Sequence, residues 1–209
     1  MTLKVLDEYN IKYTYKGLKI FIQGNQKYVA NNVIVEGDYS NAAFLDALNY
    51  LDNKVEVLGL VEDSLQGDKK YLEYFKKINK GHATLEIGNC IDLAPILMAL
   101  GAVKHGVTLT GTNRLKIKES DRAAAMQIEL AKIGVSVDIF NDFLIVHKCE
   151  LHQPTSDFDS HNDHRIAMSL SILSCMFDIK INNYEAVSKS YPTYFEDLIK
   201  LGGDITYEN

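Results

Sequence analysis

Residues 121–139, DRAAAMQIELAKIGVSVDI, contain the pattern that decides the fold. Apolar side chains recur at helical spacing across Asp121–Ile133, which is typical of an amphipathic helix. Gly134 is the residue type that commonly ends a helix, and the apolar–polar alternation that follows predicts a half-buried strand. The segment therefore predicts a helix that leads directly into a strand.

The same pattern recurs along the chain, at 2–15, 69–87 and 193–206. Between these copies lies a second kind of helix that is apolar on most sides and is therefore expected in the core. Its three examples are SNAAFLDAL (40–48), LAPILMAL (93–100) and RIAMSLSIL (165–173). Each begins just after an aspartate and is followed by a short predicted strand, at 55–60, 107–110 and 179–182.

These elements make a unit of strand, buried helix, strand, amphipathic helix and strand pair, which occurs about three times. The predicted fold is an α/β domain of βαβαββ repeats with buried helices inside and sheets outside. Residues 1–34 hold only a helix and a hairpin, so we expect them to be the end of a preceding domain and residues 35–209 to form the repeat domain. We accordingly expect a fragment, or the downstream half of a larger protein.

The composition excludes several classes of protein. With 46% hydrophobic and 24% charged residues the chain is expected to fold, and no apolar stretch reaches the roughly 20 residues that span a bilayer. A formal net charge of −6 without a basic run argues against a general nucleic-acid binder. The three scattered cysteines match neither a disulfide framework nor a zinc site, and no secretory signal is visible. A cytoplasmic location is expected.

Only three of the 22 basic residues are arginines: Arg114, Arg122 and Arg165. Codon bias is one explanation. The other is that each arginine stands where a planar, bidentate and permanently charged group is needed.

Charged residues are densest in RLKIKESDR, residues 114–122. We expect Lys116 and Lys118 to share one face of a strand, and Ser120 to cap the helix that follows. Glu119 and Arg122 would then lie at the helix N-terminus, where anions are favoured. The alternative is a solvated loop with an ion pair between these two residues at i,i+3 spacing.

A second charged segment, HNDHR (161–165), leads into a buried helix. Desolvation of Arg165 is expensive there, so it needs a fixed anionic partner, either an internal carboxylate or a bound ligand. A metal site is disfavoured because His161 and His164 lack a clear third ligand. Simple support of the helix N-terminus is the expected role of His164.

Asp92 and Lys189 become candidate site residues only through the repeat. Asp92 by itself is interpreted as a helix N-cap, Lys189 as a surface lysine, and Cys90 as a packing residue. The repeat places these residues and those above on equivalent helix starts and loops, which meet at one end of the domain. Several cations with two carboxylates there indicate group transfer on a polyanionic substrate.

At these motifs the chain resembles the 5-enolpyruvylshikimate-3-phosphate synthases, or 3-phosphoshikimate 1-carboxyvinyltransferases. The motifs, in family order, are EGDYSNAA (36–43), SLQGD (64–68), Asp92 with its helix, LKIKESDR (115–122), NDHRIAM (162–168) and SKSYP (188–192). The related transferase that acts on UDP-N-acetylglucosamine lacks the KESDR and NDHRIAM pair. The resemblance implies a fold of two domains, each of three βαβαββ units, of which this chain covers the C-terminal one plus the last helix and hairpin of the other.

The resemblance also implies an activity. The enolpyruvyl group of phosphoenolpyruvate is transferred to the 5-hydroxyl of shikimate 3-phosphate with release of phosphate, in the shikimate pathway to chorismate and aromatic amino acids. No metal or cofactor is expected, and the chain alone is expected to be inactive without the missing N-terminal domain. Two alternatives remain open: a non-catalytic binding or scaffold module, and transfer to another anionic acceptor.

The resemblance assigns roles to six residues of this sequence. Asp92 would contact the acceptor hydroxyl as base or orienter, and Glu119 would move the proton on the methylene carbon. The binding residues would be Arg122, Arg165 and Lys189 for phosphoenolpyruvate, and Lys118 with Asp92 for shikimate 3-phosphate. Arg114 stands where some members have asparagine, and we leave it outside the site.

Overall fold

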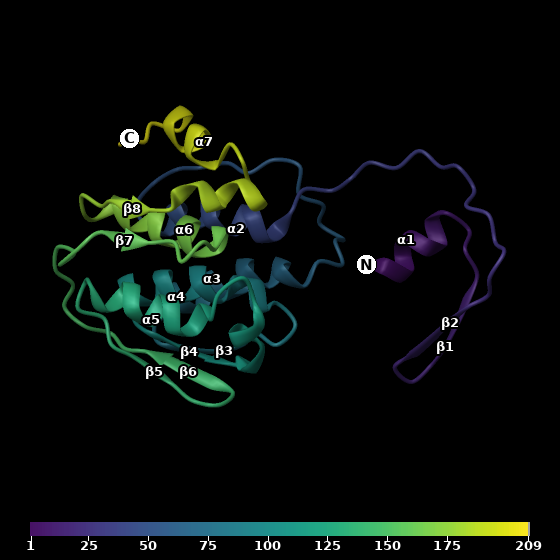
Figure 1. Cartoon of the computed structure of the whole chain (residues 1–209), viewed down its shortest axis with the longest axis horizontal. Helices are drawn as coiled ribbons and strands as arrows, with labels where there is room; N and C mark the ends of the chain where they lie inside the picture. The colour runs from purple at the N-terminus through teal and green to yellow at the C-terminus, as the bar shows by residue number, and fades with distance from the viewer. Residues whose placement is uncertain (209) are drawn as a thin grey trace.

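The computed structural model describes residues 1–208, and Figure 1 shows that most of them form one body of helices packed on sheets. One βαβαββ unit is complete. It comprises β3 (Ala83–Glu86), α4 (Ala94–Val103), β4 (Val107–Thr110), α5 (Arg122–Ala131), β5 (Val137–Ile139) and β6 (Phe143–Val146). The sheet order is β3-β4-β6-β5; β3 and β4 are parallel because α4 crosses between them, and the other pairs are antiparallel. The predicted unit is confirmed here.

Helix α4 lies at the centre of the core. Nine of its ten residues are buried, and it contacts α2 (Tyr39–Ala47), α3 (Tyr71–Lys80), α5 and α6 (His164–Ser171), as well as β4 and β6. Gly101 lets α4 approach β4 closely, because a Cβ at this position would lie 2.5 Å from Cγ1 of Val107. The prediction that this apolar helix is buried is confirmed.

The flanking helices follow their sequence patterns. In α3 the buried residues are Tyr71, Tyr74, Phe75 and Ile78, a single stripe at helical spacing. The other two buried helices are capped by the aspartates that precede them: Asp38 accepts a hydrogen bond from Ser40 N (2.8 Å) and Asp163 from Arg165 N (3.0 Å). Local capping thus fixes where α2 and α6 begin.

The third unit is shorter than predicted. Strands β7 (Phe158–Asp159) and β8 (Ile181–Asn182) pair in parallel and lead to α7 (Tyr194–Lys200). The strands predicted at 55–60 and 202–206 were wrong, since neither segment is a strand in the part of the chain that the structure describes. Alternating side chains are not sufficient for a strand, which also needs a neighbouring strand to exchange ladder hydrogen bonds. Gly59 accepts a backbone bond from Gly37, and Gly203 donates back to Leu198 in α7.

The N-terminal segment stands apart from this body (Figure 1). It consists of α1 (Thr2–Glu8), β1 (Tyr13–Lys16) and β2 (Lys19–Ile22), the predicted helix and hairpin. Helix α1 buries none of its residues, and every residue of β2 is exposed. Across the residues described, no helix has both the length and the apolar character needed to cross a membrane.

Candidate active site

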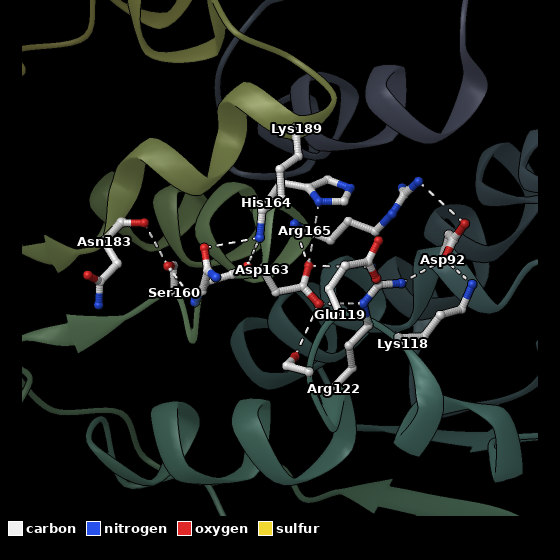
Figure 2. A network of polar contacts seen from close by, with 12 residues as sticks. Asp92, Lys118, Glu119, Arg122, Ser160, Asp163, His164, Arg165, Asn183 and Lys189 are labelled. Carbon is white, nitrogen blue, oxygen red and sulfur yellow. Dashed lines mark hydrogen bonds and ion pairs between the residues drawn. The ribbon is translucent and has the colours of Figure 1, made fainter.

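Charged side chains from four segments meet in one cluster (Figure 2). Asp92 comes from the 3-10 turn Ile91–Leu93 before α4, and Lys118 and Glu119 come from the loop before α5. Arg122 is the first residue of α5, and Asp163, His164 and Arg165 surround the start of α6. Lys189 ends the 3-10 helix Tyr184–Lys189. The predicted convergence of the repeat loops is therefore present in this structure.

Arg122 is the centre of the cluster, with only 1% of its side chain exposed. Its Nε donates to Asp163 Oδ2 (2.8 Å), and its Nη1 donates to Asp92 Oδ1 (2.6 Å). Its Nη2 donates to Glu119 Oε2 (2.6 Å) and Asp163 Oδ1 (3.3 Å). Burial by itself lowers the pKa of Arg122, but the surrounding carboxylates outweigh burial and raise that pKa. The guanidinium is therefore a permanent charge that joins three carboxylates.

Asp163 is completely buried and links α6 to α5. It caps α6, binds Arg122 and accepts a hydrogen bond from the Ser120 hydroxyl (3.1 Å). Burial raises its pKa, and its bonds to Arg122 reverse the direction and hold the pKa below its usual value. The predicted cap by Ser120 was wrong: Asp121 caps α5 by accepting from Ala124 N (3.2 Å). Ser120 instead turns its hydroxyl toward the buried carboxylate.

Asp92 is not the predicted helix cap, because it lies within the 3-10 turn and the N-cap position of α4 is Leu93. Its carboxylate faces three cations instead: Arg122 Nη1 at 2.6 Å, Lys118 Nζ at 3.0 Å and Arg165 Nη2 at 3.4 Å. Burial raises the pKa of Asp92, but these cations outweigh it and lower the pKa to about 2. Asp92 is therefore fully ionised at neutral pH.

The loop before α5 differs from the prediction. Residues Asn113–Ile117 form a 3-10 helix that buries Leu115, so Lys116 and Lys118 do not share a strand face. Lys118 follows the helix in an extended conformation and reaches Asp92. The i,i+3 ion pair between Glu119 and Arg122 is confirmed, but the loop is not merely solvated, because Glu119 is 39% exposed while Arg122 is buried. Glu119 thus lies at the rim of the cluster.

Arg165 has a partner and a spare donor. Its side chain is 11% exposed, Nη2 contacts Asp92, and Nη1 is buried without a hydrogen-bond partner among the described residues. The predicted need for an anionic partner is thus met at Nη2 by Asp92, while Nη1 is a buried donor without a partner among the described residues. Neighbouring His164 is also buried; burial and then Arg165 lower its pKa, so this imidazole is neutral at pH 7.

The other residues that the sequence singled out have different surroundings. Lys189 is exposed and donates to the backbone oxygen and Oδ1 of Asn162, just ahead of α6. Arg114 is exposed and donates to Gly88 O, beside the loop that leads to Asp92. His161 pairs with Glu129, and no group of three possible metal ligands occurs in the described residues.

Asp68 belongs to the electrostatics of the site, although the sequence analysis assigned it no role. Burial raises its pKa to about 6, the negative charge of Asp92 adds to this effect, and Arg165 opposes it. Gln66 precedes the 3-10 helix Gly67–Lys70 that contains Asp68, and its side chain ties this helix to the segment before α2: it accepts from Tyr39 N (2.9 Å) and donates to Gly37 O (2.8 Å). The QGD motif was the only signal in the sequence, and its spacing to the other charged residues gave no hint of proximity.

Comparison with known proteins identifies the family of the chain. The family model described as EPSP synthase (3-phosphoshikimate 1-carboxyvinyltransferase) matches residues 1–198. A 3-phosphoshikimate 1-carboxyvinyltransferase of Clostridium novyi (strain NT) is 39% identical over 98% of this chain, and one of Clostridioides difficile (strain 630) is 35% identical over 98%. Each match covers 52% of the relative, so the chain spans about half the length of these curated relatives.

Solved structures show the same fold. EPSP synthase from Acinetobacter baumannii superposes with a TM-score of 0.81 over 96% of this chain and 54% of that protein, at 24% identity. The enolpyruvyl transferase NikO from Streptomyces tendae superposes with a TM-score of 0.67 over 99% of this chain and 53% of that protein, at 16% identity. The predicted enolpyruvyl transferase-like fold is therefore confirmed, and the chain belongs to the EPSP synthase (3-phosphoshikimate 1-carboxyvinyltransferase) family.

Proposed function

We propose that this chain supplies the C-terminal half of an enzyme that transfers the carboxyvinyl group of phosphoenolpyruvate to the 5-hydroxyl of shikimate 3-phosphate. The observation that carries the proposal is the buried Nη1 of Arg165, which has no partner among the described residues and lies in a cluster of cations and carboxylates. A buried, unpaired guanidinium nitrogen is unfavourable unless a ligand oxygen completes it. Family membership supports phosphoenolpyruvate as this ligand.

The second half of the site is proposed to come from the N-terminal domain of the same enzyme. Residues 1–34 would be the end of that domain and residues 35–209 the C-terminal domain. The exposed apolar side chains around β2 support this division, since Leu18, Ile20, Phe21 and Ile22 need a covering surface. The three free cysteines fit the proposed cytoplasmic location.

Binding of phosphoenolpyruvate is assigned to Arg165, Lys189 and Arg122. Arg165 has the unpaired donor Nη1, and its planar guanidinium group suits a carboxylate or phosphate with two oxygens side by side. Arg122 already makes four hydrogen bonds, so it contributes its remaining N–H and its charge, or exchanges Glu119 for the ligand. Lys189 would bind the phosphate group of phosphoenolpyruvate after its ammonium group gives up the hydrogen bond to Asn162.

Proton movements are assigned to the two partly exposed carboxylates of the cluster, Asp92 and Glu119. A pKa of about 2 makes Asp92 a weak base, which favours orienting the acceptor hydroxyl; with Lys118 it would hold shikimate 3-phosphate. Ligand charges that pair with Arg165 would offset part of the field on Asp92 and raise its basicity. Glu119, at the exposed rim, would protonate the methylene carbon as the hydroxyl oxygen attacks C2 and gives its proton to Asp92. Glu119 would then take a proton back from the resulting methyl group as the bond between C2 and the phosphate oxygen breaks, and the departing phosphate would carry away the proton held by Asp92.

The proposal is tested by adding the missing N-terminal portion to this chain and measuring phosphate release from phosphoenolpyruvate in the presence of shikimate 3-phosphate. The isolated chain is expected to show no turnover, and the complemented pair is expected to be active. Glu119→Gln should lower kcat by about 100-fold or more, as expected for loss of a general acid–base group. Glu73→Gln, on the exposed face of α3, is the matched control.

Three outcomes would contradict the proposal. An inactive complemented pair would favour a binding or scaffold module. Full activity of Glu119→Gln would exclude its proton role. Turnover with a different phosphorylated acceptor, but none with shikimate 3-phosphate, would assign another substrate.

A further inference from the structure

The turn between β7 and α6 has an unusual backbone. His161 and Asn162 follow each other with φ values of 52° and 55°, the left-handed region that residues other than glycine rarely adopt. Each such residue costs roughly 1–2 kcal/mol, so surrounding contacts must maintain the conformation. The turn matters because Asp163 and Arg165 follow it directly, and its geometry determines where both side chains point.

Glu129 of α5 supplies the main contacts from outside the turn. Its side chain is 1% exposed and its two oxygens are both used. Oε1 lies 2.8 Å from His161 Nε2, and Oε2 accepts from Asp159 N at 2.9 Å. Lys132 Nζ also donates to Oε2 at 2.7 Å, which balances the buried charge. A buried carboxylate thus holds the residues on either side of Ser160.

Glu129 and Arg122 lie on the same face of α5, because seven residues make nearly two helical turns. Arg122 binds Asp163 at one end of the turn, and Glu129 binds Asp159 and His161 at the other. Helix α5 therefore holds the turn at two points.

Lys189 also contacts the turn. It donates to Asn162, the second left-handed residue. Ser160 reinforces the turn internally, since its Oγ accepts from Asn162 N (3.1 Å) and donates to Asn183 O (2.7 Å). A change in the turn would therefore affect both Lys189 and Arg165.

We propose that Glu129 is a positioning residue: through His161 and Asp159 it maintains the left-handed turn that orients Arg165 and supports Lys189. Glu129 itself lies outside the charged cluster and has no role in the chemistry. The catalytic consequence rests on the proposed function, but the structural part does not.

The structural part is tested by hydrogen–deuterium exchange on the whole chain. Glu129→Gln keeps the side-chain shape but removes the charge, and His161→Asn removes the imidazole while keeping a residue that tolerates the left-handed region. Both should speed amide exchange in residues 159–166 by about tenfold or more, as expected when a hydrogen bond to a charged group is lost. Asp138→Asn is the matched control, because Asp138 pairs with His147 at the same 2.8 Å but is 56% exposed.

The His161→Asn chain is expected to fold even if Glu129→Gln does not, because His161 is 30% exposed and its replacement leaves Glu129 bound to Lys132. Unchanged exchange in 159–166 in the His161→Asn chain would overturn the proposal. An increase spread evenly over the chain in both variants would also overturn it, because Glu129 would then act on overall stability alone.

In the complemented enzyme, Glu129→Gln should raise KM for phosphoenolpyruvate about tenfold and change kcat less, since a displaced Arg165 weakens binding. Wild-type KM in a variant with faster local exchange would refute the link to Arg165. A complemented wild-type enzyme without any activity would refute the proposed function, while the exchange result would still decide the role of Glu129.

Discussion

Asp92→Asn offers a direct test of the electrostatics of the cluster. The cations around Asp92 lower its pKa from 3.8 to about 2. Because one pKa unit corresponds to 1.36 kcal/mol, the ionised carboxylate should contribute about 2 kcal/mol to the free energy of unfolding at pH 7. The Asp92→Asn substitution keeps the shape of the side chain and removes this contribution, so the variant should be less stable by about the same amount.

The effect has a defined pH dependence. A carboxylate with a lowered folded-state pKa stabilises the fold above its unfolded pKa, and this stabilisation disappears as the pH falls through the folded pKa. The difference between wild type and Asp92→Asn should therefore be constant from pH 7 to pH 5 and fall to about half by pH 3. Urea unfolding at pH 7, 5, 4 and 3, followed by circular dichroism, measures this difference.

Glu73→Gln is the control for this experiment. Lys77 lies 2.5 Å from Glu73 and lowers its pKa, but both side chains are at least half exposed, so solvent screens the pair. The free energy of unfolding of the Glu73→Gln chain should match that of the wild type within error. An Asp92→Asn chain as stable as wild type at pH 7, or a difference that stays constant down to pH 3, would refute the view that Lys118, Arg122 and Arg165 stabilise the ionised Asp92.

Three further changes test the packing and the site. Gly101→Ala should destabilise the chain by about 1–3 kcal/mol in urea unfolding, because its Cβ would lie 2.5 Å from Val107 Cγ1; unchanged stability would mean that α4 moves easily. Tyr194→Phe removes a buried hydroxyl that lies 2.8 Å from Ser171 Oγ, so thermal unfolding should show a loss of about 1 kcal/mol, and a stabilised variant would contradict this. Arg165→Lys in the complemented enzyme should raise KM for phosphoenolpyruvate about tenfold or more, because an ammonium lacks the second prong; steady-state kinetics with unaltered KM would exclude a bidentate role.

The local parts of the fold could be predicted from the sequence because helices depend on nearby residues. Apolar spacing located α3, α4 and α5, and the aspartate before α2 and α6 marked the start of each. The expected strands at 55–60 and 202–206 failed because pairing depends on a distant neighbour, which alternation in one segment cannot specify. In the complete unit each expected strand does have such a neighbour, since β3 pairs with β4, β4 with β6 and β6 with β5.

In the candidate site, too, local features could be predicted and long-range contacts could not. Motif resemblance located Asp92, Arg122 and Arg165, and the structure brings them together. The bond between Arg122 and Asp163 could not be predicted, because it joins residues 41 positions apart that were each explained locally. The arginine count was only partly informative, since Arg114 contacts a backbone oxygen outside the cluster.

On the proposed function, the charge balance of the cluster explains why this half-site would need a second domain. Ion pairs join three cations (Lys118, Arg122 and Arg165) to three carboxylates (Asp92, Glu119 and Asp163). The formal charges of these six groups cancel, so the chain keeps its buried charges paired without a ligand, at the expense of affinity for anions. A polyanionic ligand must replace some internal carboxylates, and the 3.4 Å contact between Arg165 and Asp92 is the longest of these ion pairs and has a free donor beside it. The remaining ligand charge then requires cations from outside the cluster, which on the proposed function come from the N-terminal domain across the closed cleft.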